Sequence, residues 1–189
     1  MVLVKICGIT NLTDALAAAA AGADMLGFNF YHGSARFITA SAARRIIDLL
    51  PPRILSVGVF VNEESPEAVV RLAELAGVGA VQLHGDESPA YCRAVSHRMV
   101  IKALRVGSDF KPAQAAEYHT EAILLDAYSG AARGGTGETC DWTLARSTCE
   151  ITSKLFLAGG LTPDNVEEAI RAVRPLRSGR SSARMTVPQ

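Results

Sequence analysis

The sequence lacks several features that would place it in a specialised class of protein. Its charge is balanced, with 19 basic and 19 acidic residues among 189, so the composition gives no reason to expect nucleic acid or a membrane surface as a partner. The longest run of small apolar residues, Ala15 to Ala23, is interrupted by a glycine and is too short to span a bilayer. No positively charged, apolar-cored signal segment precedes the first predicted strand.

Two further patterns are missing. The four cysteines, Cys7, Cys92, Cys140 and Cys149, show neither a Cys-x-x-Cys spacing nor a pairing with histidine. In a chain of this length this argues against a disulfide scaffold or a zinc site and favours the reducing cytoplasm. No Gly-x-Gly-x-x-Gly follows a predicted strand, which argues against a dinucleotide-binding fold.

What the sequence contains is a regular alternation of apolar strands and helices. Continuous apolar strands indicate a parallel sheet that is covered on its outer face. Repeated strand-helix units with polar, glycine-rich residues after most strands favour a barrel, although the chain runs out before an eighth strand. Strands are expected at 2–6, 24–30, 54–61, 79–83, 99–104, 122–126 and 154–158, and helices at 12–21, 40–50, 65–77, from 88 onward, at 113–118 and at 162–173.

The first strand carries the first candidate residue. Cys7 lies where this strand ends and a loop begins, which is where parallel α/β folds keep their chemistry. Lys5 lies two residues earlier and therefore points to the same side of the strand. Taken alone, Cys7 fits better the commoner role of a free cysteine, that of a small buried hydrophobe.

Two loops after later strands add basic candidates. Arg36 follows the second strand, where its guanidinium could hold a carboxylate or phosphate through two hydrogen bonds; alone, an ordinary surface arginine is favoured. His84 follows the fourth strand and could be an acid, a base or a hydrogen-bonding wall residue.

Three further candidates follow the sixth and seventh strands. Asp126 ends an apolar strand, so its carboxylate must meet water, a cation or a substrate, or else serve as a helix cap or ion-pair partner. The loop Gly134-Gly135-Thr136-Gly137 is rich in amides that can fold over an anion. Gly159 and Gly160 precede a helix start, an arrangement that indicates a phosphate site.

Together these motifs resemble phosphoribosylanthranilate isomerase, a TIM-barrel enzyme of tryptophan biosynthesis. The resemblance is collinear from about residue 2 to Pro175. It is carried by Lys5-Ile6-Cys7-Gly8-Ile9-Thr10, Gln82-Leu83-His84-Gly85-Asp86-Glu87, Leu125-Asp126-Ala127, Gly134-Gly135-Thr136-Gly137, Asp141-Trp142 and Leu157-Ala158-Gly159-Gly160-Leu161.

The resemblance implies an Amadori rearrangement of N-(5-phosphoribosyl)anthranilate to the 1-deoxyribulose phosphate product. It implies a small phosphorylated substrate, no metal, no organic cofactor, and a monomer or homodimer. It places the general base on Cys7 and the general acid on Asp126, the anthranilate carboxylate on Arg36 and half of the phosphate site on Gly159 and Gly160, with His84 and Gly135 as further substrate-binding residues. We add the hypothesis that Lys5 assists Cys7 electrostatically.

The chain departs from the family pattern at its C-terminus. The family continues with a Gly-Val-Asp-Val-Ser-Ser-Gly-Val-Glu type of strand and loop and a final helix, whereas residues 176–189 have no apolar strand run, no acidic residue and three arginines. We therefore expect a barrel domain over residues 1–175, without the normal eighth strand and final helix, followed by a poorly ordered tail. Unpaired edges on the first and seventh strands would then lower stability and activity.

Two alternatives to an active isomerase remain. One is a non-catalytic or defective barrel that at most binds a phosphorylated or anthranilate-like ligand. The other is a related sugar-phosphate isomerase of histidine synthesis, which performs the same rearrangement. That enzyme type is expected to use two carboxylates, so Cys7 argues against it.

Overall fold

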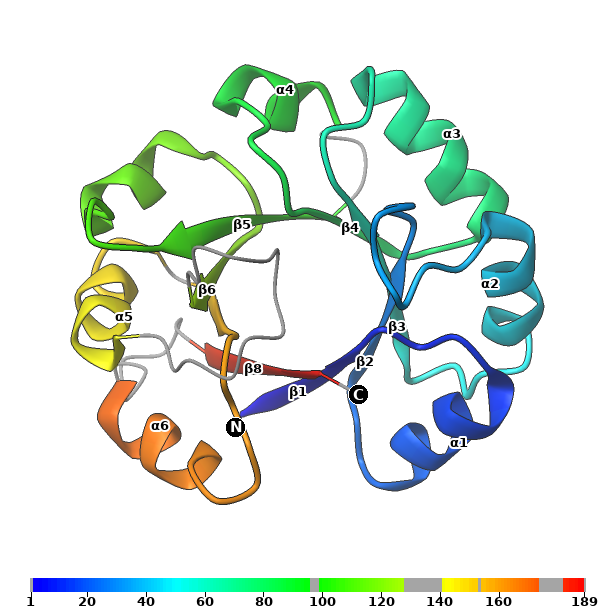
Figure 1. Ribbon diagram of the computed structural model, residues 1–189, viewed down its shortest axis with the longest axis horizontal. Coiled ribbons are helices and arrows are strands. Elements are labelled where there is room, and N and C mark those ends of the chain that lie inside the picture. Colours follow the sequence, from blue (N-terminus) through cyan, green and yellow to red (C-terminus); the bar gives the residue numbers. More distant parts are fainter. Residues whose placement is uncertain (1, 96–98, 128–140, 153, 174–181, 189) are drawn as a thin grey trace.

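The protein folds into a closed barrel of eight parallel strands. The structure, a computed structural model, describes residues 2–95, 99–127, 141–152, 154–173 and 182–188. The strands follow one another around the barrel in chain order, and helices form a ring outside them (Figure 1). The predicted TIM-barrel class is confirmed.

The elements alternate as the sequence predicts, with two additions. The strands are β1 (Leu3–Cys7), β2 (Met25–Asn29), β3 (Leu55–Phe60), β4 (Ala80–Leu83), β5 (Met99–Val106), β6 (Ala122–Ala127), β7 (Lys154–Leu157) and β8 (Ser182–Pro188). The helices are α1 (Leu12–Ala20), α2 (Ala40–Ile47), α3 (Pro66–Ala76), α4 (Pro89–Ala94), the 3-10 helix η1 (Pro112–Glu117), α5 (Trp142–Cys149) and α6 (Val166–Val173). The two additions, α5 and β8, were not predicted from the sequence.

Side chains at the helix starts explain where several helices begin. Asn11, Thr39, Ser65 and Ser88 each accept a hydrogen bond from a backbone amide of the first turn that follows. Such caps satisfy amides that have no partner within the helix. Asp141 caps α5 in the same way, so the Asp-Trp motif has a structural role as a helix start.

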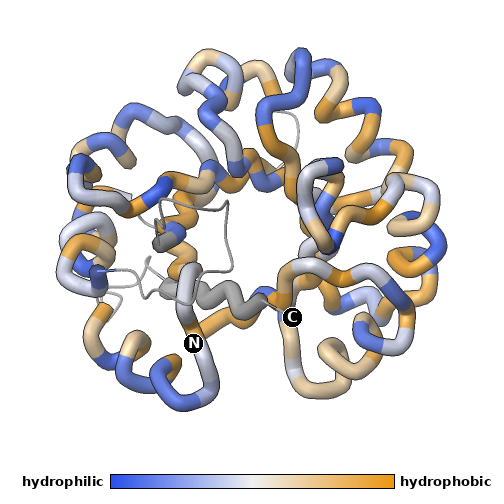
Figure 2. The backbone as a smooth tube through the Cα atoms, in the orientation of Figure 1, coloured by the Kyte–Doolittle hydropathy of each residue, from blue (hydrophilic) through white to orange (hydrophobic). Residues whose placement is uncertain are grey.

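Alternation along the strands separates the barrel interior from the layer under the helices. One set of alternate residues forms the interior cluster, which includes Met25, Val57, Ile101, Leu124 and Phe156. Because side chains alternate along a strand, Lys5, Gln82 and Asp126 share this inward direction. The opposite set joins the helices in two outer clusters, one under α1 to α4 and one under α5, α6 and η1. In Figure 2 the strands of the barrel wall are mostly apolar, whereas the helices outside them carry both polar and apolar residues.

The expectation of an open barrel is wrong. β8 pairs in parallel with β7, Leu157 opposite Met185, and with β1, Lys5 opposite Thr186, so neither neighbouring strand has an unpaired edge. A backbone ladder needs donors and acceptors rather than an apolar sequence, which is why a tail without the family pattern can still supply this strand. The part of the chain that the structure describes contains no helix after β8.

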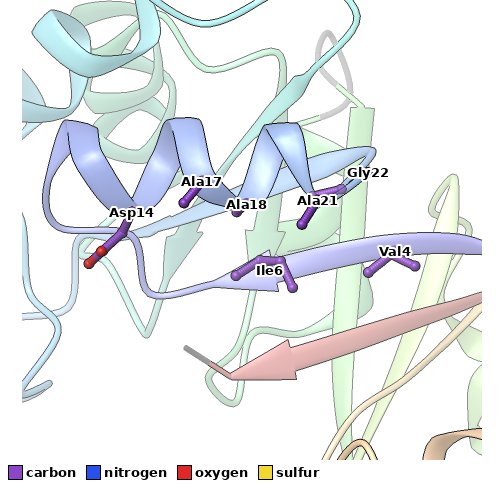
Figure 3. A pocket seen from close by; sticks show the side chains of 8 residues that line it. Val4, Ile6, Asp14, Ala17, Ala18, Ala21 and Gly22 are labelled. Atoms are coloured by element: carbon purple, nitrogen blue, oxygen red, sulfur yellow. The ribbon is translucent and has the colours of Figure 1, made fainter.

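The outer layer is interrupted beside β1. A pocket of about 400 Å³ lies between the outer face of β1 and helix α1 (Figure 3). We call this pocket the seam; it is lined by Val4, Ile6, Asp14, Ala17, Ala18, Ala21, Gly22 and Ala23. Both β1 residues there are only half-buried, whereas β4 is buried along its whole length. Among the described helices, none is long and apolar enough to cross a membrane.

Candidate active site

Cys7 and Lys5 meet over a glycine of the neighbouring strand. Cys7 is the register partner of Gly27 in β2. A Cβ atom at Gly27 would lie 2.8 Å from Cys7 Sγ and 3.1 Å from Lys5 Nζ. The thiol and the ammonium group therefore occupy the space that any larger residue at position 27 would need. Lys5 is fully buried, and its Nζ has no hydrogen-bond partner among the residues described.

Cys7 differs from the other cysteines that the structure describes. Its side chain is partly accessible, whereas Cys92 and Cys149 are buried under the helices. Burial raises the pKa of the Cys92 thiol to about 11 and that of the Cys149 thiol to about 11, because desolvation disfavours the thiolate. Cys7, Cys92 and Cys149 are all free thiols.

Arg36 reaches back from the loop after β2 to the end of β1. Its Nη1 donates a hydrogen bond to the carbonyl oxygen of Cys7 at 3.3 Å. Gly8 makes this possible: its φ is +98°, and a Cβ there would lie 2.5 Å from Arg36 Cδ. Because only glycine combines that backbone angle with the missing side chain, Gly8 leaves room for the Arg36 side chain to lie against the backbone at the end of β1.

Asp126 lies near the carboxyl end of β6 and is hydrogen-bonded to His84. The distance from His84 Nε2 to Asp126 Oδ2 is 3.1 Å, and the exposed fractions of the two side chains are 22% and 12%. On its other side, His84 Nδ1 is 2.7 Å from Nε2 of Gln82, which is 1% exposed. The three side chains form a chain of hydrogen bonds from β4 to β6.

A buried ion pair supports the loop that carries His84. Lys102 Nζ lies 2.6 Å from Glu87 Oε2 and donates to the carbonyl oxygen of Gly85 at 2.8 Å. The Glu87 carboxylate also accepts from the amides of Gly85 and Asn62. Each charge is thus paired and hydrogen-bonded, which is the condition under which buried charges are tolerated.

The loop after β7 presents two glycines in left-handed conformations. Gly159 has φ +85° and Gly160 has φ +63°. Asn165 orders this loop, because its side chain donates to the carbonyl oxygen of Gly160 and accepts from the amide of Thr162, both at 2.8 Å. No described carbonyl or side chain accepts from the amides of Gly159 and Gly160, so these amides are available to an anion.

The structure thus places most of the predicted site residues at one edge of the barrel. Cys7, Arg36, His84, Asp126, Gly159 and Gly160 all lie at or just beyond the carboxyl ends of strands. Gly135, with its loop Gly134–Gly137, lies outside the described residues. The sequence analysis gave no role to three residues of this region, Gln82, Lys102 and Asn165. A signal was present for the first two, because each is a polar residue inside a largely apolar strand.

These features define a class of protein. In closed parallel barrels the carboxyl edge of the strands carries the active site, and the loop after the seventh strand contributes to phosphate binding. A thiol and a carboxylate at that edge, with an arginine and glycine amides nearby, indicate an α/β-barrel enzyme that acts on a small anionic molecule.

Comparison with known proteins identifies the family. Residues 4–182 match the family model for N-(5'-phosphoribosyl)anthranilate (PRA) isomerase, and the chain belongs to that family. It is 50% identical over 188 residues to N-(5'-phosphoribosyl)anthranilate isomerase from Trichlorobacter lovleyi, covering 100% of this chain and 91% of the relative.

Solved structures agree with this assignment. The crystal structure of phosphoribosyl anthranilate isomerase from Thermus thermophilus matches with a TM-score of 0.86 and 39% identity, over 98% of this chain and 86% of that chain. A phosphoribosyl anthranilate isomerase in complex with reduced 1-(o-carboxyphenylamino)-1-deoxyribulose 5-phosphate matches with a TM-score of 0.82 and 41% identity, over 100% of this chain and 88% of that chain.

Proposed function

We propose that this chain catalyses the Amadori rearrangement of N-(5'-phosphoribosyl)anthranilate in tryptophan biosynthesis. The family membership supports the reaction. The observation that carries the residue roles is that the partly accessible thiol Cys7 and the carboxyl group of Asp126 face the barrel interior at the same edge.

The reaction needs an acid and then a base. Asp126 donates a proton to the furanose ring oxygen while the bond from C1 to that oxygen breaks, and the nitrogen lone pair forms the C1=N bond of a protonated Schiff base. The Cys7 thiolate then removes the C2 proton, and the electron pair moves through C1 to nitrogen to give an enolamine. Tautomerisation places a proton on C1 and leaves the ketone at C2. After product leaves, Cys7 returns its proton and Asp126 regains one through solvent, so the net proton count is zero.

Binding groups at the same edge fit the charges of this substrate. Arg36, whose side chain lies against the backbone at the end of β1, is positioned for the anthranilate carboxylate. The amides of Gly159 and Gly160 are positioned for the phosphate, although β8 ends at Pro188 and the described structure includes no second phosphate loop after it. His84 fits a role in holding Asp126, and Gly135 remains a prediction from the family motif.

The buried ammonium group of Lys5 is proposed to assist Cys7. A positive charge next to a thiol favours the thiolate, and Lys5 Nζ lies on the same side of Gly27 as Cys7 Sγ. A Lys5→Met variant should change the dependence of rate on pH and slow alkylation of Cys7 by iodoacetamide. An unchanged pH–rate profile would exclude this role.

The test is an isomerase assay by loss of substrate fluorescence, with Cys7→Ala and Asp126→Asn as variants. Turnover that each variant reduces by about 10²- to 10⁴-fold, the range for general acid–base groups, supports the proposal. Tight binding of the reduced product by calorimetry without any turnover would instead indicate the non-catalytic alternative. Equal turnover by Cys7→Ala would remove the thiol from the mechanism.

A further inference from the structure

The chain of hydrogen bonds behind the proposed acid contains a residue with no assigned role. Gln82 lies inside β4, is 1% exposed and points into the barrel. A carboxamide in the interior of an apolar strand is costly to bury unless its polar atoms are used. Its Nε2 is used, at 2.7 Å from His84 Nδ1, whereas its Oε1 has no hydrogen-bond partner among the described residues.

In the structure the amide nitrogen of Gln82, not its oxygen, faces His84 Nδ1, and this orientation determines which ring nitrogen can carry the proton. An amide nitrogen is only a donor, so His84 Nδ1 must be the acceptor and carry no proton. The imidazole is then neutral, and its proton is on Nε2. Nε2 lies 3.1 Å from Asp126 Oδ2, so His84 donates to that oxygen. The tautomer of a histidine is generally set by the hydrogen bond at its other nitrogen.

We infer that Gln82 is a positioning residue that holds His84 as the neutral Nε2–H tautomer, and through it orients the Asp126 carboxyl group. This inference rests on the proposed function, because it concerns the residue proposed as the acid. It follows that Asp126 Oδ2 is committed to His84, that Oδ1 is the oxygen that delivers the proton to substrate, and that the proton is stored on Asp126 rather than on His84.

The opposite amide orientation gives a different result, which makes the inference testable. If the Gln82 side chain were rotated by half a turn, Oε1 would accept from a protonated Nδ1, and His84 would be an imidazolium or the Nδ1–H tautomer. That orientation would leave both N–H groups of the amide without an acceptor among the described residues. In the orientation of the structure, the groups without a partner are one N–H and Oε1. The acid would then share its proton with His84.

The direct test is nuclear magnetic resonance of protein labelled with ¹³C and ¹⁵N in histidine. The chain has four histidines, and a His84→Asn variant identifies the signal of His84. The ring ¹⁵N shifts at pH 7 distinguish the two neutral tautomers and the imidazolium without any need for turnover. We expect the neutral Nε2–H form; an imidazolium or the Nδ1–H form in the unmodified chain would overturn the inference.

Two variants at Gln82 sharpen this test. Gln82→Glu replaces the donor with a carboxylate, so His84 should become an imidazolium. Gln82→Met keeps the length of the side chain without its polar atoms, so both neutral tautomers should be populated. In each variant we expect kcat to fall about 10- to 100-fold, as when a supporting hydrogen-bond partner is lost, with KM changed less than about threefold.

Ser56→Ala provides the matched control. Ser56 is also a buried polar residue of the sheet, and its Oγ accepts from the amide of Gly79, away from His84. Its loss should leave the His84 signals and kcat unchanged. If the Gln82 variants left the His84 signals unchanged, the inference would fail even if the enzyme were active; if they altered the signals in a chain without turnover, only the proposed function would fail.

Discussion

Two regions of the barrel differ in how well helices cover the outer face of the strands. One is formed by β2 to β5, which we call the closed side, and the other is the seam beside β1. On the closed side, β2 to β5 lie under α1 to α4, and apolar side chains such as Leu26, Phe28 and Val69 are fully buried. At the seam, Val4 and Ile6 of β1 face a pocket and stay half-buried. The barrel ladder is nevertheless continuous through β8. Closure of the sheet and coverage of its outer face are therefore separate requirements, and this chain meets the first more fully than the second.

The site residues are divided between β1 and other strands of the barrel. Gln82 and His84 belong to β4 and the loop after it, and Asp126 to β6, whereas Cys7 ends β1, the strand that borders the seam. The proposed acid is thus held by a partly buried chain of hydrogen bonds. The proposed base lies over Gly27 beside Lys5, and its backbone carbonyl accepts a hydrogen bond from Arg36.

The largest expected effect separates Cys7 from the other thiols. Cys7→Ala should reduce kcat by about 10²- to 10⁴-fold. Cys92→Ala, which removes a buried thiol on the closed side, should leave kcat within about twofold of the original, since Cys92 lies outside the site. Loss of substrate fluorescence measures both. Similar losses for the two variants would mean that the thiol at position 7 acts through packing alone.

The next effect concerns the buried ion pair on the closed side. Lys102→Met leaves the Glu87 charge buried without its partner, so the free energy of unfolding should fall by about 3–5 kcal/mol. Glu167→Gln is the control, because it breaks an exposed pair with Arg171 on α6 that contributes less than about 0.5 kcal/mol. Urea denaturation followed by circular dichroism measures the difference. A small effect of Lys102→Met would show that water reaches Glu87.

A third prediction compares the two sides directly at one register position. Ile6 and Leu26 are paired across β1 and β2, and both belong to the outer face. Leu26 is fully buried, so Leu26→Ala should lower the free energy of unfolding by about 2–5 kcal/mol. Ile6→Ala should lower it by about 1 kcal/mol, because its side chain already faces the pocket.

The same denaturation experiment decides whether the seam is uncovered in solution. Equal losses for the two variants would mean that Ile6 is covered there, for instance by a second copy of the chain, and light scattering would then detect the homodimer. Unequal losses with a monomeric mass would agree with the structure.

The smallest effect is a loss of stability in alkali. The pKa of Cys92 and that of Cys149 are each raised by burial from 9.0 to about 11. The folded state therefore keeps these protons after the unfolded state has lost them, so stability is full below pH 9 and falls as pH rises toward 11. At pH 10 the loss should be about 1 kcal/mol for each thiol. Cys149→Ala should reduce the fall in the free energy of unfolding between pH 9 and pH 11, as measured by urea denaturation. If neither Cys149→Ala nor Cys92→Ala changed this fall, burial of the two thiols would not be its cause.

Much of the fold could be predicted because local signals agreed. Caps such as Ser65 and Ser88, helix stops such as Gly77 and continuous apolar strands mark the first five units, and the structure confirms them. β8 could not be predicted, because its sequence lacks an apolar run and its strand conformation depends on the exposed ladders of β1 and β7. α5 was missed although Asp141 carries a capping signal, since the helix is only eight residues long and polar residues are mixed with apolar ones along it.

The candidate site divides in the same way. The positions of Cys7, Arg36, His84 and Asp126 at strand ends follow from the alternation of strands and loops. Their contacts do not: the hydrogen bond from Arg36 to the Cys7 carbonyl and the chain from Gln82 to Asp126 join residues from different strands. Such contacts depend on barrel register, which no local pattern specifies.

The central claim is that this chain is itself an active isomerase. The most direct test is to measure kcat/KM of the chain as given and of a variant whose residues 176–189 are replaced by the family-type strand, loop and helix. We predict measurable turnover by the chain as given, lost in Cys7→Ala, and a higher kcat/KM with a higher unfolding temperature in the replaced variant. A cooperatively folded chain that binds the reduced product and shows no turnover, while the replaced variant is active, would contradict the proposal that this chain is itself an active isomerase.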